Sequence, residues 1–280
     1  MTLSIITINY NNLEGLRKTT ESVLSQTWHD YEWIIIDGGS TDGSKEFIEE
    51  TFHNLKDSEF NPLTYWCSES DKGIYNAMNK GIAKARGEYV NFMNSGDLFY
   101  EYDTLKRVFC KPYSAEIIYG NVCYVNDKSE KIYAYPSPVN IFRLYFETIC
   151  HQAFFTKTEI LKDSPYDESY KLCADHAKLI EMAINFAVFE YVPIEICKYD
   201  TSGLSYTRLD IIEEEVNRIH KTLFPPTLIA LIDEHRILHD RNIYKAVEIT
   251  TNGGVTKKIF NFFISFTIFI DKIKKNYFKI

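Results

Sequence analysis

The chain has 280 residues, of which 45% are hydrophobic and 25% are charged, and its formal net charge at pH 7 is -8. This composition is typical of a folded globular protein, with enough length for one large α/β domain and an appendage, or for two modest domains. An acidic chain lacks the broad positive field of a nucleic-acid-binding protein, so we expect no nucleic acid among its partners.

Strand-like and helix-like segments alternate along the first hundred residues. Apolar, β-branched runs predict strands, and apolar residues at helical spacing predict the helices between them. The predicted strands are 3–10, 33–36, 63–67 and 89–93, and the predicted helices are 13–24, 47–55 and 74–85. We expect Gly87 to end the third helix, as glycine does at the C′ position. This alternation predicts a doubly wound sheet.

The pattern is more mixed after residue 100. We predict a helix near 104–109, a strand at 116–119, a β-ribbon of 122–125 and 131–135, a helix at 174–187, a strand at 188–196, and helices from 209 onward that are broken at Pro225-Pro226. Residues 259–270 are intensely apolar and flanked by lysines, but a bilayer span needs about 20 apolar residues. The stretch 256–280 either lies in a membrane interface or forms a core or homodimer helix.

The six cysteines are widely spaced, and no two of them form a Cys-x-x-Cys pair. This spacing favours free thiols in a reducing compartment over a disulfide or zinc framework. The first ten residues have neither a basic segment nor a small-residue cleavage site. We therefore expect no signal peptide and a cytoplasmic location.

Polar side chains follow the four predicted parallel strands at their carboxyl ends. Ligands bind beyond this edge in open parallel sheets, so these side chains are candidates for one binding site. They are Thr7 and Asn9, then Asp37, then Glu69, Asp71 and Lys72, and finally Asn94 and Asp97. Any single acidic turn has an ordinary structural role, but four of them on one rim indicate a site.

Several common catalytic motifs are absent. The sequence contains no G-x-G-x-x-G after the first strand, no G-x-x-x-x-G-K-[ST], no H-E-x-x-H and no G-x-S-x-G. These absences weigh against a dehydrogenase, a P-loop kinase, a zinc protease and a serine hydrolase. A diphosphate bound without a glycine cradle needs a hard divalent cation, for which Asp97 is the candidate ligand.

A set of motifs in chain order resembles the family 2 inverting glycosyltransferases of GT-A fold, of the bacterial surface-polysaccharide type. The matching segments are 4–11, 22–27, 31–43, 71–81, 85–89 and 94–97, with weaker matches at 151–152 and 174–176. The resemblance implies an α/β, GT-A-type doubly wound mixed sheet in residues 1–206. A Rossmann-like nucleotide-sugar-binding half (1–100) and an acceptor half (101–206) would precede a helical C-terminal extension (207–280).

The resemblance also implies roles for individual residues. Thr7 and Asp37 would contact the base and ribose of the nucleotide, with Asn9 and Asn94 in the same donor-binding set. Glu69, Asp71 and Lys72 would line the donor pocket. Asp97 would hold Mn²⁺ or Mg²⁺ on the diphosphate, and Asp175 matches the catalytic base. His151 either approaches the metal or the phosphates, or simply packs.

The chain departs from the family pattern at two places. Gly38 follows Asp37 where many members have a second acid, and Asp97 is the one acid kept in the metal motif. The absence of a Gln-x-x-Arg-Trp motif weighs against a processive, polymer-extending role.

The predicted function is transfer of a hexosyl or N-acetylhexosaminyl group, with inversion, from a nucleoside-diphosphate sugar to an acceptor hydroxyl. A UDP-sugar is the expected donor, and a saccharide or lipid-linked saccharide is the expected acceptor. Lipopolysaccharide, capsule or glycolipid synthesis on the cytoplasmic face of the plasma membrane would use such a reaction. Two alternatives stay open: a nucleotidyltransferase, and a non-catalytic scaffold that binds nucleotide sugars.

Overall fold

The computed structural model describes residues 1–126, 129–135, 138–201 and 208–239. The chain divides into a compact unit Met1–Leu223 and a second unit that begins at Phe224. The described part of the second unit contains helix α10 (Pro226–His239), which begins at the predicted proline break. The prediction for 256–280 lies outside the described residues. No helix in the described ranges is long and apolar enough to cross a membrane.

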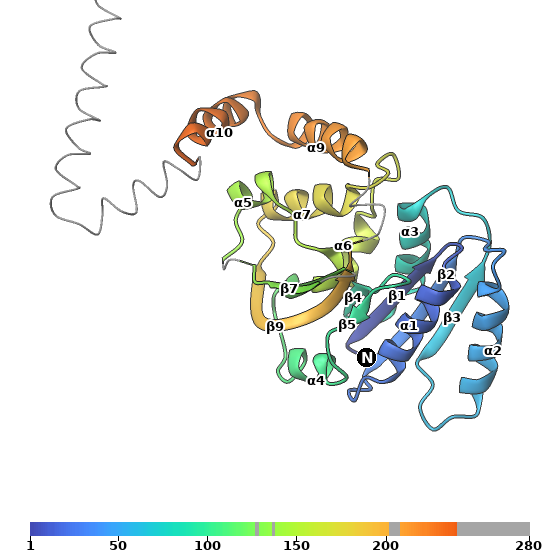
Figure 1. Cartoon of the computed structure of the whole chain (residues 1–280). Helices are drawn as coiled ribbons and strands as arrows, with labels where there is room; N and C mark the ends of the chain where they lie inside the picture. Colours follow the sequence, from blue (N-terminus) through green and yellow to red (C-terminus); the bar gives the residue numbers. More distant parts are fainter. Residues whose placement is uncertain (127–128, 136–137, 202–207, 240–280) are drawn as a thin grey trace, which may run out of the picture. The chain divides into compact units, whose positions relative to one another are not determined.

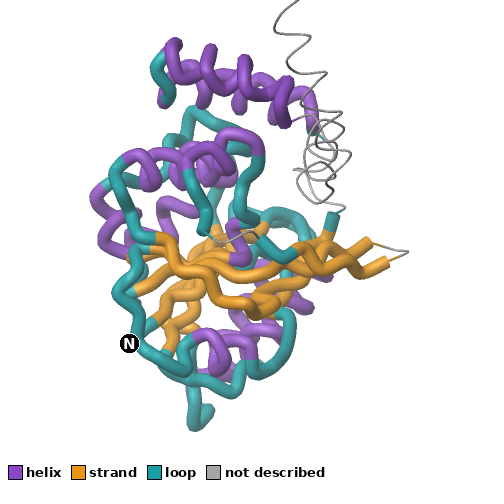
Figure 2. Tube along the Cα trace, turned by 90° about the vertical axis from the view of Figure 1, so that its left-hand side faces the viewer, coloured by secondary structure: helices purple, strands orange, loops and turns teal. Residues whose placement is uncertain are grey.

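The described part of the first unit contains a nine-stranded mixed sheet, in the order β3-β2-β1-β4-β8-β6-β9-β5 with β7 paired to β6. Figure 2 shows these strands as a layer between helices. The strands are β1 (Leu3–Asn9), β2 (Tyr31–Asp37), β3 (Leu63–Ser68), β4 (Tyr89–Phe92), β5 (Leu98–Phe99), β6 (Ile117–Asn126), β7 (Ser129–Tyr133), β8 (Phe154–Lys157) and β9 (Phe189–Asp200). The helices are α1 (Leu13–Leu24), α2 (Ser44–Lys56), α3 (Ile74–Lys84), α4 (Thr104–Val108), α5 (Ile141–Phe146), α6 (Thr158–Asp163), α7 (Ala174–Ile184) and α9 (Leu209–Leu223).

The parallel half of the sheet agrees with the sequence prediction. Strands β3, β2, β1 and β4 run parallel, α1 contacts α2, and α3 packs on β1 and β2 (Figure 1). The register places Asn9 beside Asp37, and Asp37 beside Ser68. The predicted doubly wound α/β arrangement is therefore confirmed, and it brings the polar strand ends to one edge.

The second half of the sheet was predicted only in part. The predicted strand at 116–119 and the first arm of the predicted ribbon form one continuous strand, β6, while β7 is the second arm. Strand β9 continues four residues past the predicted end at 196. Strand β8 was not predicted, because its four residues show no alternation. It joins β4 to β6 by antiparallel pairing on both sides.

Gly87 does not have the predicted role. Helix α3 ends at Lys84, and Ala85 already has extended backbone angles. A Cβ atom on Gly87 would lie 2.5 Å from the backbone carbonyl carbon of Leu3 and from the nitrogen of Ser4. Gly87 is thus required by the close approach of this segment to β1, and not by a left-handed helix cap.

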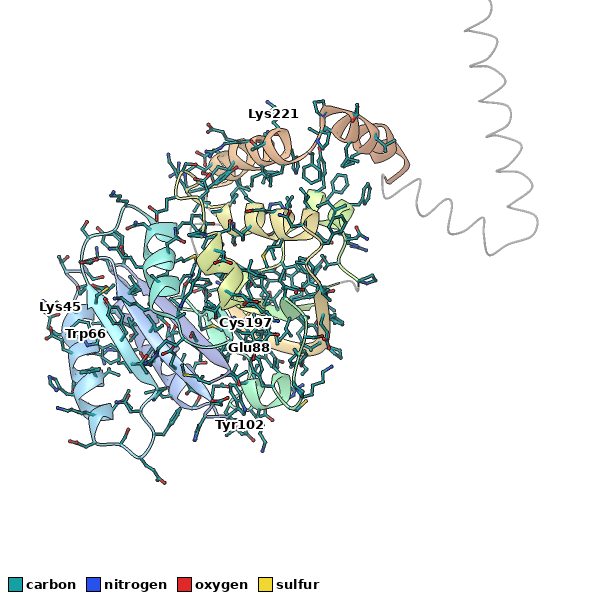
Figure 3. All side chains as sticks on the ribbon, turned by 180° about the vertical axis from the view of Figure 1, so that it is seen from behind. Lys45, Trp66, Glu88, Tyr102, Cys197 and Lys221 are labelled. Carbon is teal, nitrogen blue, oxygen red and sulfur yellow. The ribbon has the colours of Figure 1, made fainter. Side chains whose placement is uncertain are left out.

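All six cysteines are free, as predicted. Cys123, Cys173 and Cys197 are buried, and burial raises the pKa of the Cys173 thiol to about 12. Figure 3 shows Cys197 among the crowded side chains of the second half of the sheet. A thiol with a raised pKa is protonated at neutral pH and is a poor nucleophile, so we assign no chemistry to Cys173.

Candidate active site

A cavity of about 820 Å³ opens at the carboxyl ends of the parallel strands. Its wall comes from the segments that follow β1, β2, β3 and β4, together with the His151–Gln152 turn, the start of α7 and the end of β9. Seven of the ten predicted site residues line it: Asn9, Asp71, Lys72, Asn94, Asp97, His151 and Asp175. Thr7, Asp37 and Glu69 do not line it.

Thr7 is buried beneath the cavity. Its side chain is fully inaccessible, the hydroxyl donates to the carbonyl of Met93 at 2.8 Å, and it accepts from Trp33 Nε1 at 2.9 Å. The hydroxyl thus makes one donated and one accepted hydrogen bond inside the protein, and a contact between Thr7 and the nucleotide stays a prediction. The residue instead ties β1 to the chain that follows β4.

Asp37 organises the loop that follows β2 but is not exposed to the cavity. Its carboxylate accepts hydrogen bonds from Asn9 Nδ2 at 2.7 Å, Ser40 Oγ at 2.5 Å and Ser68 Oγ at 2.6 Å. Burial raises the pKa of Asp37, but these bonds outweigh burial and hold its pKa below the usual value. These contacts give Asp37 a positioning role in this structure, and its direct contact with the nucleotide stays a prediction.

Two glycines after Asp37 supply the cavity wall. A Cβ on Gly38 would lie 3.1 Å from the Tyr10 ring and 3.3 Å from Asp71 Oδ2. Gly39 has a φ of +80°, where residues with a side chain are strained. The wall here is bare backbone, which lets a ligand approach closely.

Glu69 and Asp71 follow β3 but differ in position. Lys80 Nζ lies 2.5 Å from Asp71 Oδ1 and 2.8 Å from Glu69 Oε1. Only Asp71 reaches the cavity, whereas the Glu69 side chain is 62% exposed at the outer surface. Glu69 does not line this cavity, and its place in the donor pocket stays a prediction. Lys72 is exposed at the cavity edge.

Asp97 ends a turn that is hydrogen-bonded to helix α1. The Thr19 hydroxyl lies 2.8 Å from the Asp97 carbonyl oxygen and 3.1 Å from the Asn94 carbonyl oxygen. Gly96 between them has a φ of +106°, which favours glycine. The turn therefore presents the Asp97 side chain to the cavity from a fixed backbone.

The Asp97 carboxylate is buried beside a single side-chain amide. Gln152 Nε2 donates to Asp97 Oδ2 at 2.5 Å, and Asp97 is 7% exposed. Burial raises the pKa of Asp97 to about 6, and the bond from Gln152 offsets this only in part. A carboxylate with a burial-raised pKa gains stability when a cation binds beside it.

His151 bridges the metal-motif turn and the predicted base. Its Nε2 lies 2.9 Å from Asn94 Nδ2, and its Nδ1 lies 3.1 Å from Asp175 Oδ2. This fits the neutral tautomer whose Nδ1–H donates to Asp175 while Nε2 accepts from Asn94. Both ring nitrogens have a partner in this structure, so His151 orients Asp175 here, and its role as a metal ligand stays a prediction.

Asp175 stands at the first turn of α7 with its side chain 13% exposed. Tyr75 in α3 donates to its Oδ1 at 2.9 Å, and His151 contacts the other oxygen. Burial raises the pKa of Asp175, but the bonds from His151 and Tyr75 outweigh burial, so its pKa lies below the usual value. Asp175 is therefore an oriented, ionised carboxylate at neutral pH.

Several residues that line the cavity were not predicted from the sequence. Tyr75 lies in the predicted helix and in the matching segment 71–81, and Gln152 lies in the weaker match at 151–152, but neither was assigned a role. Tyr199 and Asp200 line the cavity because β9 extends beyond its predicted end. Asp200 adds a second carboxylate on the side of Asp97, and its charge raises the pKa of Asp97. The strand-like sequence continues from Phe189 to Asp200, and following it to its end would have placed Asp200 near the site.

Helix α9 holds the loop that leads to the catalytic candidate. Glu215 is 7% exposed, and its carboxylate accepts hydrogen bonds from the backbone nitrogens of Lys171 at 2.5 Å, Leu172 at 2.9 Å and Cys173 at 3.0 Å. An acceptor that satisfies three such groups before α7 also offsets the positive end of that helix. Glu215 is thus a positioning residue for Asp175.

Replacing Glu215 with Ala is expected to destabilise the protein by about 2–3 kcal/mol, since three backbone donors, of which that of Cys173 is buried, lose their acceptor. The kcat of any reaction that uses Asp175 should fall more than the affinity for a ligand in the cavity, because the start of α7 shifts. Thermal unfolding and steady-state kinetics would check this. Glu214, an exposed neighbour on the same helix, provides the control Glu214→Ala. Equal effects of the two substitutions would contradict the positioning role.

The residues around Asp97 fit a hard divalent cation that keeps other ligands. In the described part of the chain, no cluster of three or more His, Cys, Asp or Glu side chains forms a metal site. Asn94 Oδ1 and Ser95 Oγ, however, are buried at this cavity without a hydrogen-bond partner. One carboxylate with such oxygens suits an ion such as Mg²⁺, which also binds phosphates and water.

Residues 4–163 match the family model described as glycosyl transferase family 2. A PGL/p-HBAD biosynthesis glycosyltransferase of Mycobacterium bovis is 30% identical over 214 residues, which cover 74% of this chain and 80% of the relative.

Two solved structures have a similar fold. The mannosyltransferase PcManGT from Pyrobaculum calidifontis, in complex with GDP-Man and Mn²⁺, has a TM-score of 0.60 and 16% identity, covering 95% of this chain and 80% of the other. TarS 1–349 from S. aureus, in complex with UDP, has a TM-score of 0.58 and 19% identity, covering 71% of this chain. The match spans 60% of that TarS chain. These similarities confirm the predicted GT-A-type mixed α/β sheet.

Proposed function

We propose a function from one premise: this chain belongs to glycosyl transferase family 2. Its activity is accordingly that of a glycosyltransferase in polysaccharide or glycolipid biosynthesis. The finer proposal is that it moves a sugar from a nucleoside-diphosphate sugar to an acceptor hydroxyl with inversion. The observation that supports this most is a single cavity lined by both Asp97 and the His151–Asp175 pair.

The donor would occupy the cavity from its backbone wall towards Asp97. The nucleoside would lie against Gly38 and Gly39 near Asn9, where bare backbone allows close approach. The diphosphate would lie at the 94–97 turn, leaving the sugar to face Asp175. The similar structures contain UDP or GDP-Man, and on this ground we propose a nucleoside-diphosphate sugar, with a UDP-sugar first.

The metal of this proposal is Mn²⁺ or Mg²⁺, held by the Asp97 carboxylate with Asn94 Oδ1 as a further ligand. PcManGT contains Mn²⁺ in its complex, which supports the choice. When bound, such an ion stabilises the negative charge that builds on a leaving diphosphate. Gln152 keeps the carboxylate oriented through its bond to Oδ2.

Asp175 would act as the general base. The acceptor hydroxyl attacks the anomeric carbon from the face opposite the diphosphate, its proton passes to an Asp175 carboxylate oxygen, and the bond to the diphosphate breaks. Attack from the opposite face inverts the anomeric centre. The bonds from His151 Nδ1 and Tyr75 fix the carboxylate and keep it ionised before the transfer.

The acceptor and location extend this proposal. We propose a saccharide or lipid-linked saccharide acceptor of the lipopolysaccharide or capsule type, used at the cytoplasmic face of the plasma membrane. The transferred group would be a hexosyl or N-acetylhexosaminyl unit. A domain boundary at 206/207 stays a prediction; in the structure, α9 belongs to the first unit.

The proposed function is tested by incubating the purified chain with UDP- and GDP-sugars, with Mn²⁺ or Mg²⁺ and with a panel of glycoside acceptors. We expect release of a nucleoside diphosphate together with a new glycoside, whose anomeric configuration by NMR is opposite to that of the donor. Pyrophosphate released from a nucleoside triphosphate would indicate a nucleotidyltransferase instead. Tight binding of nucleotide sugars without any product would favour the scaffold alternative.

A further inference from the structure

A second cavity of about 260 Å³ adjoins the first. The two cavities share residues 72–75 and Leu172 in their walls. The second is completed by Asn76, Glu168, Tyr170 and Lys171, and by Arg208 and Ile211 at the start of α9. The 94–97 turn, which carries the proposed metal ligands, does not line it. The second cavity is therefore separate from the diphosphate position and lies on the side of Asp175.

The wall of the second cavity is rich in cations. Lys72, Lys171 and Arg208 line it, against one acidic side chain, Glu168. Within the described ranges, no carboxylate lies within 4.0 Å of the Lys72 or Lys171 ammonium group, while Arg208 has one exposed ion pair with Asp210. A local excess of positive charge stands out in a chain whose net charge is -8.

Both sides of this cavity are held in place. Arg218 of α9 stacks over the Tyr170 ring at 4.0 Å and reaches Asp167 at 3.3 Å. Glu168 accepts hydrogen bonds at 3.0 Å from Asn76 and from Asn79 of α3, which joins the two walls. The Glu168 carboxylate is thus already hydrogen-bonded within the protein, and these contacts hold in place the backbone that carries Lys171.

The wall of this cavity also reaches the catalytic candidate. Tyr75 lines both cavities and donates its hydroxyl hydrogen to Asp175, and Leu172 lies three residues before Asp175. A molecule that fills the second cavity would therefore lie against Tyr75, the residue that holds the proposed base. The donor, with its phosphates near Asp97, would not occupy the second cavity.

We propose that the second cavity binds an anionic group, a phosphate or a carboxylate, of the acceptor molecule. This inference rests on the proposed glycosyl transfer and names the acceptor class. A cluster of cations in an acidic protein offsets the repulsion that an anionic acceptor would otherwise meet. Lysine and arginine side chains form strong, charge-assisted hydrogen bonds with both groups.

The test uses the double substitution Lys171→Gln with Arg208→Gln, because neither side chain lines the donor cavity. The Lys171 backbone nitrogen keeps its bond to Glu215 in this variant. The double substitution Lys106→Gln with Arg107→Gln removes the same two charges from exposed sites on α4 that line neither cavity, and it is the matched control. Calorimetry would measure binding of glucose 6-phosphate, farnesyl phosphate, methyl glucuronide and neutral glucose, with and without saturating UDP or GDP.

We expect at least one anionic probe to bind the wild type and the control in the presence of nucleotide, and to bind the double variant about tenfold more weakly. Preference for glucose 6-phosphate would indicate an acidic saccharide, and preference for farnesyl phosphate would indicate a lipid phosphate. Absence of anion binding, or equal binding by the double variant, would overturn the inference. Nucleotide affinity should be the same in all variants, and its absence from the wild type would instead contradict the donor site.

Discussion

Replacing Asp175 with Asn is expected to lower kcat by about 10²–10⁴-fold, the usual contribution of general acid–base catalysis, while the KM for the donor changes little. The amide keeps the shape of the side chain but cannot take a proton from the acceptor. Asp175 is held by Tyr75 on one oxygen and by His151 on the other. The fold should persist because the substituted amide can still accept one of these bonds.

The matched control for this experiment is Asp163→Asn, an exposed acid at the end of α6 that lines neither cavity. Steady-state kinetics on the two variants and the wild type, with a melting curve for each, would separate catalysis from folding. A variant at Asp175 that kept full kcat would remove this residue as the base. Its proton-accepting role would then pass to another cavity carboxylate, of which Asp200 and Asp71 are the candidates.

Replacing Asp97 with Asn is expected to remove the metal dependence of the reaction. A neutral amide next to Gln152 holds a divalent cation poorly, so kcat/KM should fall at least about 100-fold, which corresponds to about 2.7 kcal/mol of transition-state stabilisation. In the wild type, chelation of divalent ions should produce a similar loss, which added Mn²⁺ restores. Donor affinity of the variant should no longer respond to Mn²⁺.

Asp57→Asn, beyond the end of α2 and exposed, provides the control for the loss of one negative charge. Binding of Mn²⁺ itself can be followed by its electron paramagnetic resonance signal in the presence of a nucleoside diphosphate, which gives a readout independent of turnover. If the Asp97 variant bound Mn²⁺ as the wild type does, or stayed fully active without metal, the assignment of Asp97 as the metal ligand would be wrong.

The parallel half of the fold was predictable because its strands are buried on both faces and its helices are amphipathic. The runs at β1 and β2 are almost entirely buried, and a continuous apolar run of this kind predicts a strand without information from other segments. The second half contains short elements, such as β8 and α6, whose existence depends on distant partners. The long pair β6–β9 joins segments about 70 residues apart, and no local pattern sets where β9 ends.

The site was predictable as a set of strand ends, but the direction of each side chain was not. Asp37 and Thr7 occupy the expected edge, yet serine, asparagine and tryptophan partners from other segments use up their polar atoms. Glu69 and Asp71 are two residues apart and share the partner Lys80, yet only Asp71 lines the cavity, which their order in the sequence does not show.

Long-range contacts also hid the relation between His151 and Asp175. The two residues lie 24 positions apart and meet only because the turn before β8 approaches the start of α7. A sequence pattern can identify each as a polar residue before a buried segment, but it gives no distance between them. The orienting role of His151 follows from its two contacts, which no sequence pattern shows.

The most direct test of the central claim is a crystal structure of the chain with a nucleoside diphosphate and Mn²⁺, with data collected at the manganese absorption edge. The account predicts an anomalous peak bridging Asp97 and the diphosphate, the nucleoside against Gly38 and Gly39, and open space between the terminal phosphate and Asp175. A nucleotide bound at another surface, or a manganese peak remote from Asp97, would contradict the account.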